Sequence, residues 1–346
     1  MKIVFCWSNI SGYMAACWRE LSERGVGVHV LAYGNSSETS FNTSLMQGVS
    51  WSSLGDDQKA DCRYVEQVVA AQEPTTVVIA GWLNPAYQKL VHSRALQACH
   101  FVMGMDTPWK GGIRQRLAPF VLRSYLQKIS TVWVPGERAW GYARKLGFPA
   151  NRIEKGLYGI DHKRLRSIYN ARTLASWPKR FLFLGRLHAE KGIDLLLRAY
   201  EKYATSQKDP WPLTVAGIGP LEKDVSNVAG VEYAGFVQPD DCAELMKKAG
   251  VLVLPSRYDP WPLALVEGAA AGLPVLASNR CGSAVEVLRQ LHNGLHCDPT
   301  IDGIAEGLSF FHGQWGGLPQ MGSHGVELSA CYSAQKWCDI LLRIAK

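Results

Sequence analysis

Short apolar runs alternate with longer amphipathic segments along almost the whole chain. In the first half, the apolar runs predict strands at residues 2–7, 27–32, 76–80, 100–104 and 131–134. Segments with helical periodicity lie between them, at residues 13–24, 61–71, 113–127 and 137–146. Strands that alternate with helices in this way are typical of a parallel sheet covered on both faces.

After residue 156 the alternation pauses and then restarts. Residues 157–178 are polar and irregular and end in SWPKR. The second series predicts strands at 181–185, 213–216, 231–234, 251–254 and 274–277, and helices at 192–205, 240–247, 262–271 and 284–290. The stretch GQWGGLPQMGSHG (313–325) predicts a loop, and residues 329–345 predict a closing amphipathic helix.

The pause predicts two Rossmann-like α/β domains. We place the first at residues 1–160, a linker at 161–178, the second at 179–325, and a C-terminal helix at 326–346 that could cross back to the first domain. A chain of 346 residues is long for one hydrophobic core and sufficient for two. Open parallel sheets bind ligands at the carboxyl ends of their strands, so a cleft between the domains is the predicted site.

Composition narrows the class of protein. Apolar residues make up 47% and charged residues 19%, which is typical of a globular chain. No apolar run is long enough to span a bilayer, and the N-terminus fits a buried strand better than a signal peptide. The nine cysteines are odd in number and form no C-x-x-C pair, which argues against a zinc site or a disulfide framework. A cytoplasmic location is expected, with the inner membrane face as the alternative.

The positive charge is unevenly spread. Residues 1–156 hold 17 basic and 11 acidic residues, a net +6, whereas residues 157–346 hold 20 and 19, a net +1. A basic N-terminal half favours an acidic ligand or an anionic membrane surface. Without a dense Lys/Arg run or a binding motif, nucleic acid is not an expected partner.

One segment concentrates these basic residues among large apolar ones. KGGIRQRLAPFVLRSYLQK (110–128) carries Lys110, Arg114, Arg116, Arg123 and Lys128. A basic amphipathic helix of this kind can rest on an anionic membrane or grip an anionic acceptor. A core helix with a solvated charged face gives the same pattern, and Pro119 weakens the helix prediction.

The stretch FLFLGRLHAEKGIDLLLRAY suggests a phosphate site. Its strand ends at Gly185, Arg186 follows, and Lys191 precedes the glycine that opens a helix. Free N–H groups at a helix start favour an anion, and the two cations would add to this attraction for a diphosphate. An ordinary surface turn with two solvated cations is the alternative. The later turn TVAGIGPLE supplies Gly217 and Gly219, which is weak evidence alone because the third glycine of the dinucleotide fingerprint is absent.

Two acids stand out in PSRYDPWPLALVEGAAAGLPVLAS. Asp259 lies in the loop after an apolar strand, where it could simply cap the next helix. Glu267 lies on that helix among small and aliphatic residues, and a buried acid requires a partner or a ligand. A carboxylate that accepts hydrogen bonds from two ribose hydroxyls would satisfy this requirement.

These blocks together resemble the retaining GT-B glycosyltransferases of the group 1 type (family 4). GRLHAEKGIDLLLRA, AGIGPLE, GVEYAGFV, LVLPSRYDPWPLALVEGAAAGLPVLAS, CGSAVEVL and NGLHCDP follow the family's order over residues 180–300. The resemblance implies a GT-B fold, with two parallel sheets facing each other across a cleft. It also implies transfer of a sugar, with retention of configuration, from a nucleoside diphosphate sugar such as a UDP or GDP sugar. The acceptor would be a saccharide or a lipid-linked sugar, as in surface polysaccharide or glycoconjugate synthesis.

The resemblance also implies roles for individual residues. Arg186 and Lys191 would hold the diphosphate and neutralise the leaving group, and Gly217 and Gly219 would form a turn beside the donor. Asp259 would contact the donor sugar, Glu267 would bind the ribose, and the helix start near Leu263 would direct N–H groups at the phosphate. Similar enzymes require neither a metal nor a cofactor.

The chain departs from the family pattern at several positions. Asp259 replaces a glutamate, and Pro262 replaces a glycine and so removes one N–H group. The glycine-rich loop after the first strand is reduced to Gly12, and the later strand is followed by Asp106 rather than a histidine. Asp106 is a candidate contact for sugar or acceptor, or alternatively the start of an Asx turn.

The departures leave other functions open on the same fold. One alternative is an epimerase or hydrolase that acts on a nucleotide sugar without an acceptor. Another is a nucleotide-binding scaffold without transferase activity. A dehydrogenase would need a full G-x-G-x-x-G after the first strand, which SNISGY does not supply.

Overall fold

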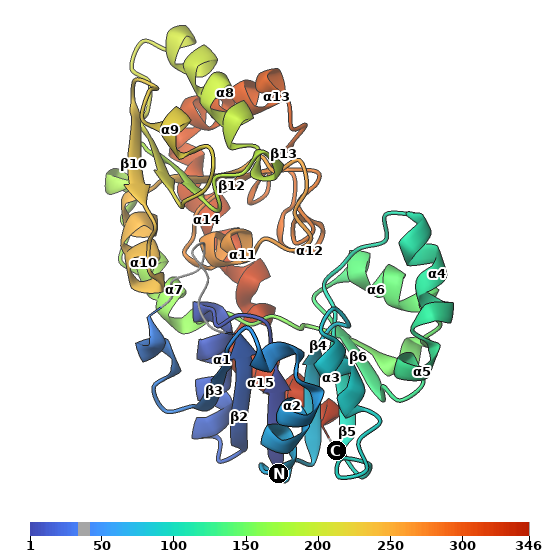
Figure 1. Cartoon of the computed structure of the whole chain (residues 1–346). Helices are drawn as coiled ribbons and strands as arrows, with labels where there is room; N and C mark the ends of the chain where they lie inside the picture. Colours follow the sequence, from blue (N-terminus) through green and yellow to red (C-terminus); the bar gives the residue numbers. More distant parts are fainter. Residues whose placement is uncertain (34–41, 346) are drawn as a thin grey trace. The chain divides into compact units, whose positions relative to one another are not determined.

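The protein folds into two compact units. A computed structural model describes residues 1–33 and 42–345 (Figure 1). The first unit comprises Met1–Ile160 together with Ala334–Lys346, and the second comprises Asp161–Ser333. Each unit has a parallel sheet covered by helices on both faces, which confirms the predicted α/β class with two Rossmann-like domains.

The first unit is built on a seven-stranded parallel sheet in the described residues, in the order β3-β2-β1-β4-β5-β6-β7. The strands are β1 (Lys2–Cys6), β2 (Gly27–Tyr33), β3 (Ser50–Leu54), β4 (Thr76–Ala80), β5 (His100–Gly104), β6 (Thr131–Val134) and β7 (Ile153–Lys155). The chain proceeds to one side from β1 and then reverses to the other side through β4. In open sheets, ligands bind at such a reversal, outside the carboxyl ends of the strands.

Residue alternation along the strands divides the core of this unit into two layers. Val4 and Cys6 face one side, whereas Ile3 and Phe5 face the other. The first layer is covered mainly by α2 (Cys62–Ala70), α3 (Pro85–Leu90), α5 (Arg123–Leu126) and α6 (Glu137–Lys145), with α4 (Ile113–Val121) at its edge. The second layer is covered by α1 (Gly12–Glu23) and by the C-terminal helix α15 (Ala334–Ile344).

Helix α15 is an integral part of this core. Trp337 is only 1% exposed and packs against Trp133 and Phe5 at centroid distances of 5.0 and 5.9 Å. Its indole N–H donates to the carbonyl of Leu157 at 2.8 Å. A Cβ atom on Gly159 would come within 2.9 Å of the Trp337 Cβ, so only glycine allows the chain to pass this closely.

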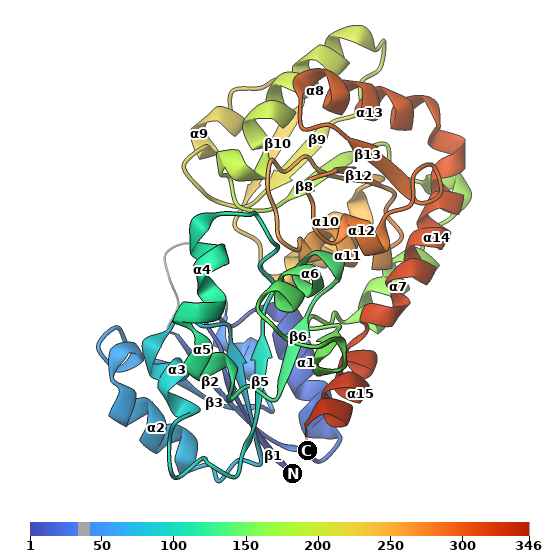
Figure 2. The same cartoon turned by 90° about the vertical axis from the view of Figure 1, so that its right-hand side faces the viewer.

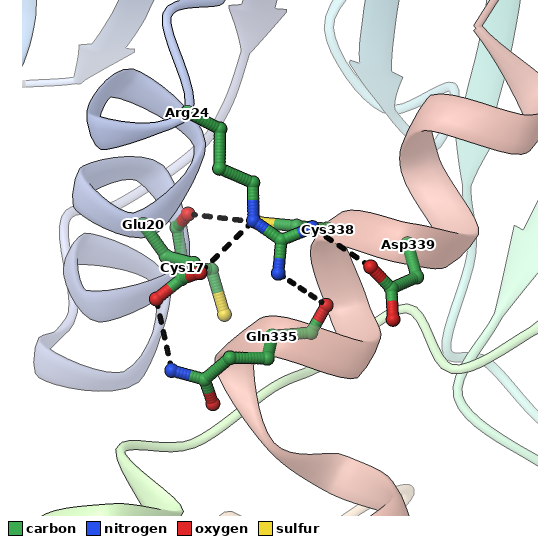
Figure 3. Close-up of polar contacts among 6 residues, drawn as sticks. All are labelled: Cys17, Glu20, Arg24, Gln335, Cys338 and Asp339. Carbon is green, nitrogen blue, oxygen red and sulfur yellow. Dashed lines mark hydrogen bonds and ion pairs between the residues drawn. The ribbon is translucent and has the colours of Figure 1, made fainter.

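A polar network joins the surfaces of α1 and α15 (Figure 3). The Arg24 guanidinium donates to Glu20 at 2.9 Å, to Asp339 at 2.7 Å and to the carbonyl of Gln335 at 3.2 Å. Gln335 donates to the other oxygen of Glu20 at 2.9 Å. Exposed pairs of this kind contribute about 0–1 kcal/mol each, so the buried Trp337 contributes more to holding α15 in place.

The second unit contains a six-stranded parallel sheet in the order β10-β9-β8-β11-β12-β13, counted over its described residues. The strands are β8 (Phe181–Leu184), β9 (Leu213–Ala216), β10 (Val231–Gly235), β11 (Val251–Leu254), β12 (Val275–Ser278) and β13 (Gly294–Cys297). The reversal of strand order lies between β8 and β11. The loops that follow these two strands are therefore the expected location of a ligand site.

Two groups of helices cover this second sheet (Figure 2). Helices α8 (Ile193–Ser206) and α13 (Ile301–Gly313) pack together over a core that includes Phe181 and Phe183. In a second group, α7 (His162–Asn170) and α14 (Leu318–Ser329) pack against α11 (Leu263–Ala270), and α10 (Pro239–Lys248) packs against α7. The short helices α9 (Glu222–Val225) and α12 (Ala284–Val287) lie in the loops after β9 and β12.

Several predicted elements require correction. The strands β3, β7 and β13 were missed because they are short or rich in polar residues, as in SWSSL and IEK. The stretch 157–178, predicted as irregular, contains the helix α7, whose buried residues His162, Leu165 and Ile168 recur at helical spacing. The predicted helix 113–127 is two helices, α4 and α5. Pro119 lies inside α4 and removes one backbone donor, and α4 ends two residues later.

The predicted loop 313–325 is also wrong, because most of it belongs to α13 and α14. Glycines in α14 allow close packing here and do not break the helix. A Cβ atom on Gly322 would lie 2.2 Å from the carbonyl oxygen of Gly272, and one on Gly325 would lie 3.2 Å from that of Ala269. The closing helix begins at Ala334 and not at residue 329, since Ser329 ends α14.

Candidate active site

The turn after β8 brings Lys191 close to the β11 side of the sheet. Residues Ala189–Lys191 form a short 3-10 helix, and Gly192 then opens α8 with a left-handed φ of 73°. A Cβ atom at Gly192 would lie 2.2 Å from the carbonyl oxygen of Pro255, so a larger residue would displace the loop after β11. Gly192 therefore allows direct backbone contact between the loops at the strand reversal.

The glycine turn after β9 packs against the same loop. Gly217 and Gly219 have φ values of 139° and 156°, and a Cβ atom on Gly217 would lie 1.9 Å from the carbonyl oxygen of Gly185. Leu187 donates to the carbonyl of Ile218 at 2.9 Å. As a motif these glycines are only weak evidence for a site, whereas in the structure they allow close backbone packing beside Arg186.

The decisive side-chain contact is an ion pair between Lys191 and Asp259. The Lys191 Nζ and the Asp259 Oδ2 are 2.6 Å apart, and the two side chains are 17% and 10% exposed. These residues come from the loops after β8 and β11, the two strands at the reversal of strand order. Helix capping was the alternative role for Asp259, but no side chain caps α11 in the described residues.

The loop that carries Asp259 is held by further polar contacts. Arg257 forms two hydrogen bonds of 2.6 Å with the carboxylate of Asp194 in the first turn of α8. On the other side, Gly282 donates to the carbonyl of Asp259 at 2.9 Å, and a Cβ atom there would lie 1.6 Å from the Pro260 carbonyl oxygen. Asp259 is therefore fixed from both sides, which defines the position of the Lys191 ammonium group.

Helix α11 begins at Leu263, one residue later than the predicted helix 262–271, and Pro262 precedes it in an extended conformation. The residue that lacks an N–H group, Pro262, therefore lies just before the helix and not within it. The N–H groups at the start of α11 remain those of Leu263 and Ala264, and a helix N-terminus of this kind favours an anion.

Glu267 lies in the middle of α11, on the side where α7 and α10 pack. Its neighbours Leu265, Val266 and Gly268 are buried. Burial raises the pKa of the Glu267 carboxyl to about 7, against a smaller opposite effect from the positive charge of Arg164. Burial also raises the pKa of the Cys242 thiol on α10 to about 12, and the charge of Glu267 contributes to this shift. The acid is thus in an environment that favours its neutral form unless a donor group reaches it.

The remaining predicted residues belong to the first unit. Gly12 is the first residue of α1, after Ser11, whose buried hydroxyl has no hydrogen-bond partner among the described residues. Asp106 follows β5 and accepts a hydrogen bond of 3.0 Å from the hydroxyl of Tyr158. The Tyr158 ring packs edge-on against Tyr13 at 5.7 Å. Tyr158 was not predicted, because it lies in the irregular stretch and carries no motif.

The structure therefore groups the predicted residues into two sets. Lys191, Asp259 and the backbone around Gly217 and Gly219 form one connected arrangement in the second unit, with the exposed side chain of Arg186 beside it. Asp106 and Gly12 belong to the first unit. None of the helices in the described residues has the length and apolar character needed to cross a bilayer.

Both halves of the chain match glycosyltransferase families. Residues 169–314 match the family described as glycosyl transferases group 1, and residues 10–154 match the glycosyl transferase 4-like domain. The chain belongs to the group 1 glycosyltransferase family. The matched regions include every predicted site residue, from Gly12 to Glu267.

Curated relatives match part of the chain. An uncharacterized glycosyltransferase of Methanocaldococcus jannaschii is 35% identical over 146 residues, 40% of this chain and 37% of the relative. Glycogen synthase of Mycobacterium tuberculosis is 30% identical over 155 residues, 42% of this chain and 36% of that protein. The matched segment thus spans less than two fifths of the length of these two relatives.

Solved structures extend the likeness of fold over the whole chain. Sucrose-phosphate synthase from Thermosynechococcus elongatus has a TM-score of 0.74 at 16% identity, covering 99% of this chain and 98% of that one. HepE of Anabaena, solved in complex with UDP and glucose, has a TM-score of 0.74 at 14% identity, covering 99% of each chain. These likenesses establish the GT-B fold.

Proposed function

We propose that the protein is a glycosyltransferase that transfers a sugar from a nucleoside diphosphate sugar to a saccharide or lipid-linked acceptor. The observation that carries this proposal is the ion pair between Lys191 and Asp259 at the strand reversal, held by loops whose backbones pack directly against one another at glycines. Family membership and the UDP complexes of HepE support the same donor class.

Lys191 would bind the diphosphate of the donor. Its ammonium group is held by Asp259 in a largely dry site, so its position is set before the donor arrives. When the bond between the sugar and the diphosphate breaks, the electron pair leaves on the diphosphate. Lys191, Arg186 and the N–H groups at the start of α11 would stabilise this negative charge, and no metal would be required for that role.

Asp259 would both orient Lys191 and contact hydroxyl groups of the donor sugar. Its side chain is one methylene shorter than the glutamate of the family pattern, and Lys191 already occupies one of its oxygens. The second oxygen remains for a sugar hydroxyl. We infer that this shorter reach affects which donor sugar is accepted.

Glu267 would bind the ribose. In the unliganded chain, burial favours the neutral form of this acid, with a pKa of about 7. Two ribose hydroxyls that donate to the ionised carboxylate would replace the missing solvation. We also propose that transfer proceeds with retention of configuration, which rests on the family resemblance, and that Asp106 contacts the acceptor or the sugar from the first unit.

The experiment is a thermal-shift screen with UDP, GDP, ADP, CMP, dTDP and their sugars, followed by transfer assays with the stabilising donor. Lys191→Met should abolish the stabilisation, whereas Lys202→Met should retain it. Lys202 is a matched control because it lies on the surface of α8 and pairs with Asp302, far along the helix from Gly192.

The outcomes separate the proposed activities. Stabilisation by no nucleotide would contradict the proposal. Stabilisation with release of free sugar or of an isomerised nucleotide sugar, and no acceptor product, would instead indicate a hydrolase or an epimerase. Binding without any turnover would indicate a scaffold. Full activity in the presence of EDTA is expected, and its loss would contradict the metal-independent role of Lys191 and Arg186.

A further inference from the structure

Helix α4 in the first unit presents its large apolar side chains to solvent. Eight large hydrophobic residues are exposed in the described part of the chain, and four of them lie within these nine residues. The four are Ile113 at 74% exposure, Leu117 at 51%, Phe120 at 76% and Val121 at 77%. A surface helix normally turns such residues toward the core, so α4 reverses the usual arrangement.

The four residues form a continuous stripe. Their spacing of i, i+4, i+7 and i+8 places them on one face of an α-helix. Ala118, on the other side, is the one buried residue of α4. At 100° per residue, Arg114 and Arg116 fall on opposite edges of the stripe, and both are exposed. In Figures 1 and 2, α4 lies at the periphery of the first unit, with α6 toward the inside.

The charge around this stripe has a single sign. Residues 107–136 contain five basic residues, Lys110, Arg114, Arg116, Arg123 and Lys128, and no acidic residue. Among the described contacts, Arg114, Arg123 and Lys128 make no hydrogen bond or ion pair through their side chains, and Arg116 donates to the carbonyl of Gly111 at 3.0 Å. Arg114, Arg123 and Lys128 are therefore not needed to hold the fold, and their charges can meet an external anionic surface.

We propose that α4 docks the protein on an anionic lipid bilayer, with the apolar stripe in the acyl region and the arginines at the headgroups. A bilayer accepts a convex row of apolar side chains without a complementary groove, and anionic headgroups match cations on both edges of the stripe. A second copy of the chain matches less well, because it would bring another first unit with the same positive charge. This docking does not depend on sugar transfer. If the proposed function holds, it would place the first unit beside a lipid-linked acceptor.

The test measures co-sedimentation of the full chain with vesicles. The vesicles contain phosphatidylcholine alone or phosphatidylcholine with about one third phosphatidylglycerol. We expect binding to the anionic vesicles only, weakened when salt is raised from about 0.05 to 0.5 M. Phe120→Ser with Val121→Ser should lower the vesicle affinity about tenfold or more, because two exposed side chains no longer enter the membrane. Both residues are exposed, so folding should be unchanged.

Matched controls come from the second unit. Leu291→Asn changes another exposed apolar residue, at a position with φ of 60° that asparagine tolerates, and should leave vesicle binding unchanged. Arg114→Gln with Arg123→Gln should weaken binding by about fivefold per charge, whereas Lys208→Gln with Lys223→Gln should have little effect. Circular dichroism and the nucleotide thermal shift should be the same in all variants.

Three results would overturn the proposal. The first is equal binding to neutral and anionic vesicles, or to neither. The second is unchanged affinity in the Phe120→Ser, Val121→Ser variant. The third is a change in oligomeric state on size exclusion caused by that variant, which would assign the stripe to a second copy. Loss of vesicle binding with retained nucleotide binding would separate this inference from the proposed function.

Discussion

The two units share one architecture but differ in how their carboxyl edges are built. In the second unit, the loops after β8, β9 and β11 pack backbone against backbone through glycines, and they enclose the ion pair of Lys191 and Asp259. In the first unit, the corresponding edge carries Asp106 bound to Tyr158, and an exposed helix follows. The same kind of sheet thus carries closely packed loops around an ion pair in one unit and an exposed apolar helix in the other.

The two units also differ in whether a single continuous segment of the chain forms them. The second unit is one continuous segment, Asp161–Ser333, whereas the first needs α15 from the end of the chain. Trp337 fills the space between Trp133 and Phe5, so the core of the first unit depends on a residue more than two hundred positions away in the sequence.

Trp337→Ala should destabilise the first unit by about 3–5 kcal/mol, because it leaves a cavity at the centre of one core layer. Hydrogen exchange read separately for peptides of each unit should show faster exchange in β1, β6 and α1, with little change in β8 to β13. Asp339→Ala is the control, since it removes only an exposed ion pair worth about 0–1 kcal/mol. Equal loss of protection in both units would contradict the contrast.

Lys191→Met should reduce kcat/KM about 10²–10³-fold, or about 3–4 kcal/mol of transition-state stabilisation, because a fixed cation at the leaving group is lost. Asp259→Asn should reduce it less, since Lys191 keeps its charge but loses its ionic partner. Steady-state kinetics with the best donor measures both. Equal kcat/KM in the parent and Lys191→Met would show that the ion pair is only structural.

Glu267→Gln should remove a pH dependence of the free energy of unfolding. Between about pH 4.5 and 7, Glu267 is protonated in the folded chain but ionised in the unfolded chain. The free energy of unfolding should therefore fall as pH rises through this window, by about 3 kcal/mol at most, and it stays lowered above it. Glu267→Gln should flatten this part of the profile, whereas the exposed Glu201→Gln should not.

The affinity for a nucleotide sugar should change with pH in the opposite direction. Ionisation of Glu267 creates the acceptor for the ribose hydroxyls, so affinity should rise as pH passes about 7. The ligand in this binding measurement should be a nucleotide sugar. A free nucleoside diphosphate has a terminal phosphate that also titrates near this pH. The same pH profile in Glu267→Gln would contradict the ribose role.

Tyr158→Phe should have the smallest effect. It removes one hydrogen bond to Asp106, worth about 0.5–1.5 kcal/mol, and keeps the ring against Tyr13. If Asp106 contacts the acceptor, KM for the acceptor should rise severalfold while donor affinity stays constant. A fall in donor affinity instead would move Asp106 to the donor side.

Much of the second unit could be predicted from the sequence. Lys191 and Asp259 lie in short loops after apolar strands, and strand order alone brings those loops together. The start of α11 at Leu263 follows from the proline that precedes it. Tyr158 could not be predicted, because its contact with Asp106 joins positions 52 residues apart and neither lies in a motif. The glycines of α14 led to the wrong prediction of a loop. Their close contacts with Gly272 and Ala269 explain them, but these contacts form only on folding.

The alternation of strands and helices, the two-unit organisation and the residues of the group 1 motifs can all be read from the sequence. These depend on local periodicity and on spacing along the chain, which are present before any tertiary contact forms. Three features depend on tertiary contacts: the ion pair of Lys191 with Asp259, the packing of α15 into the first core, and the side of α4 that is exposed. The basic segment 110–128 fits a core helix or a surface helix equally well, because periodicity defines an apolar face but not what covers it. In this fold, α4 turns Ala118 inward and leaves the large apolar side chains outside.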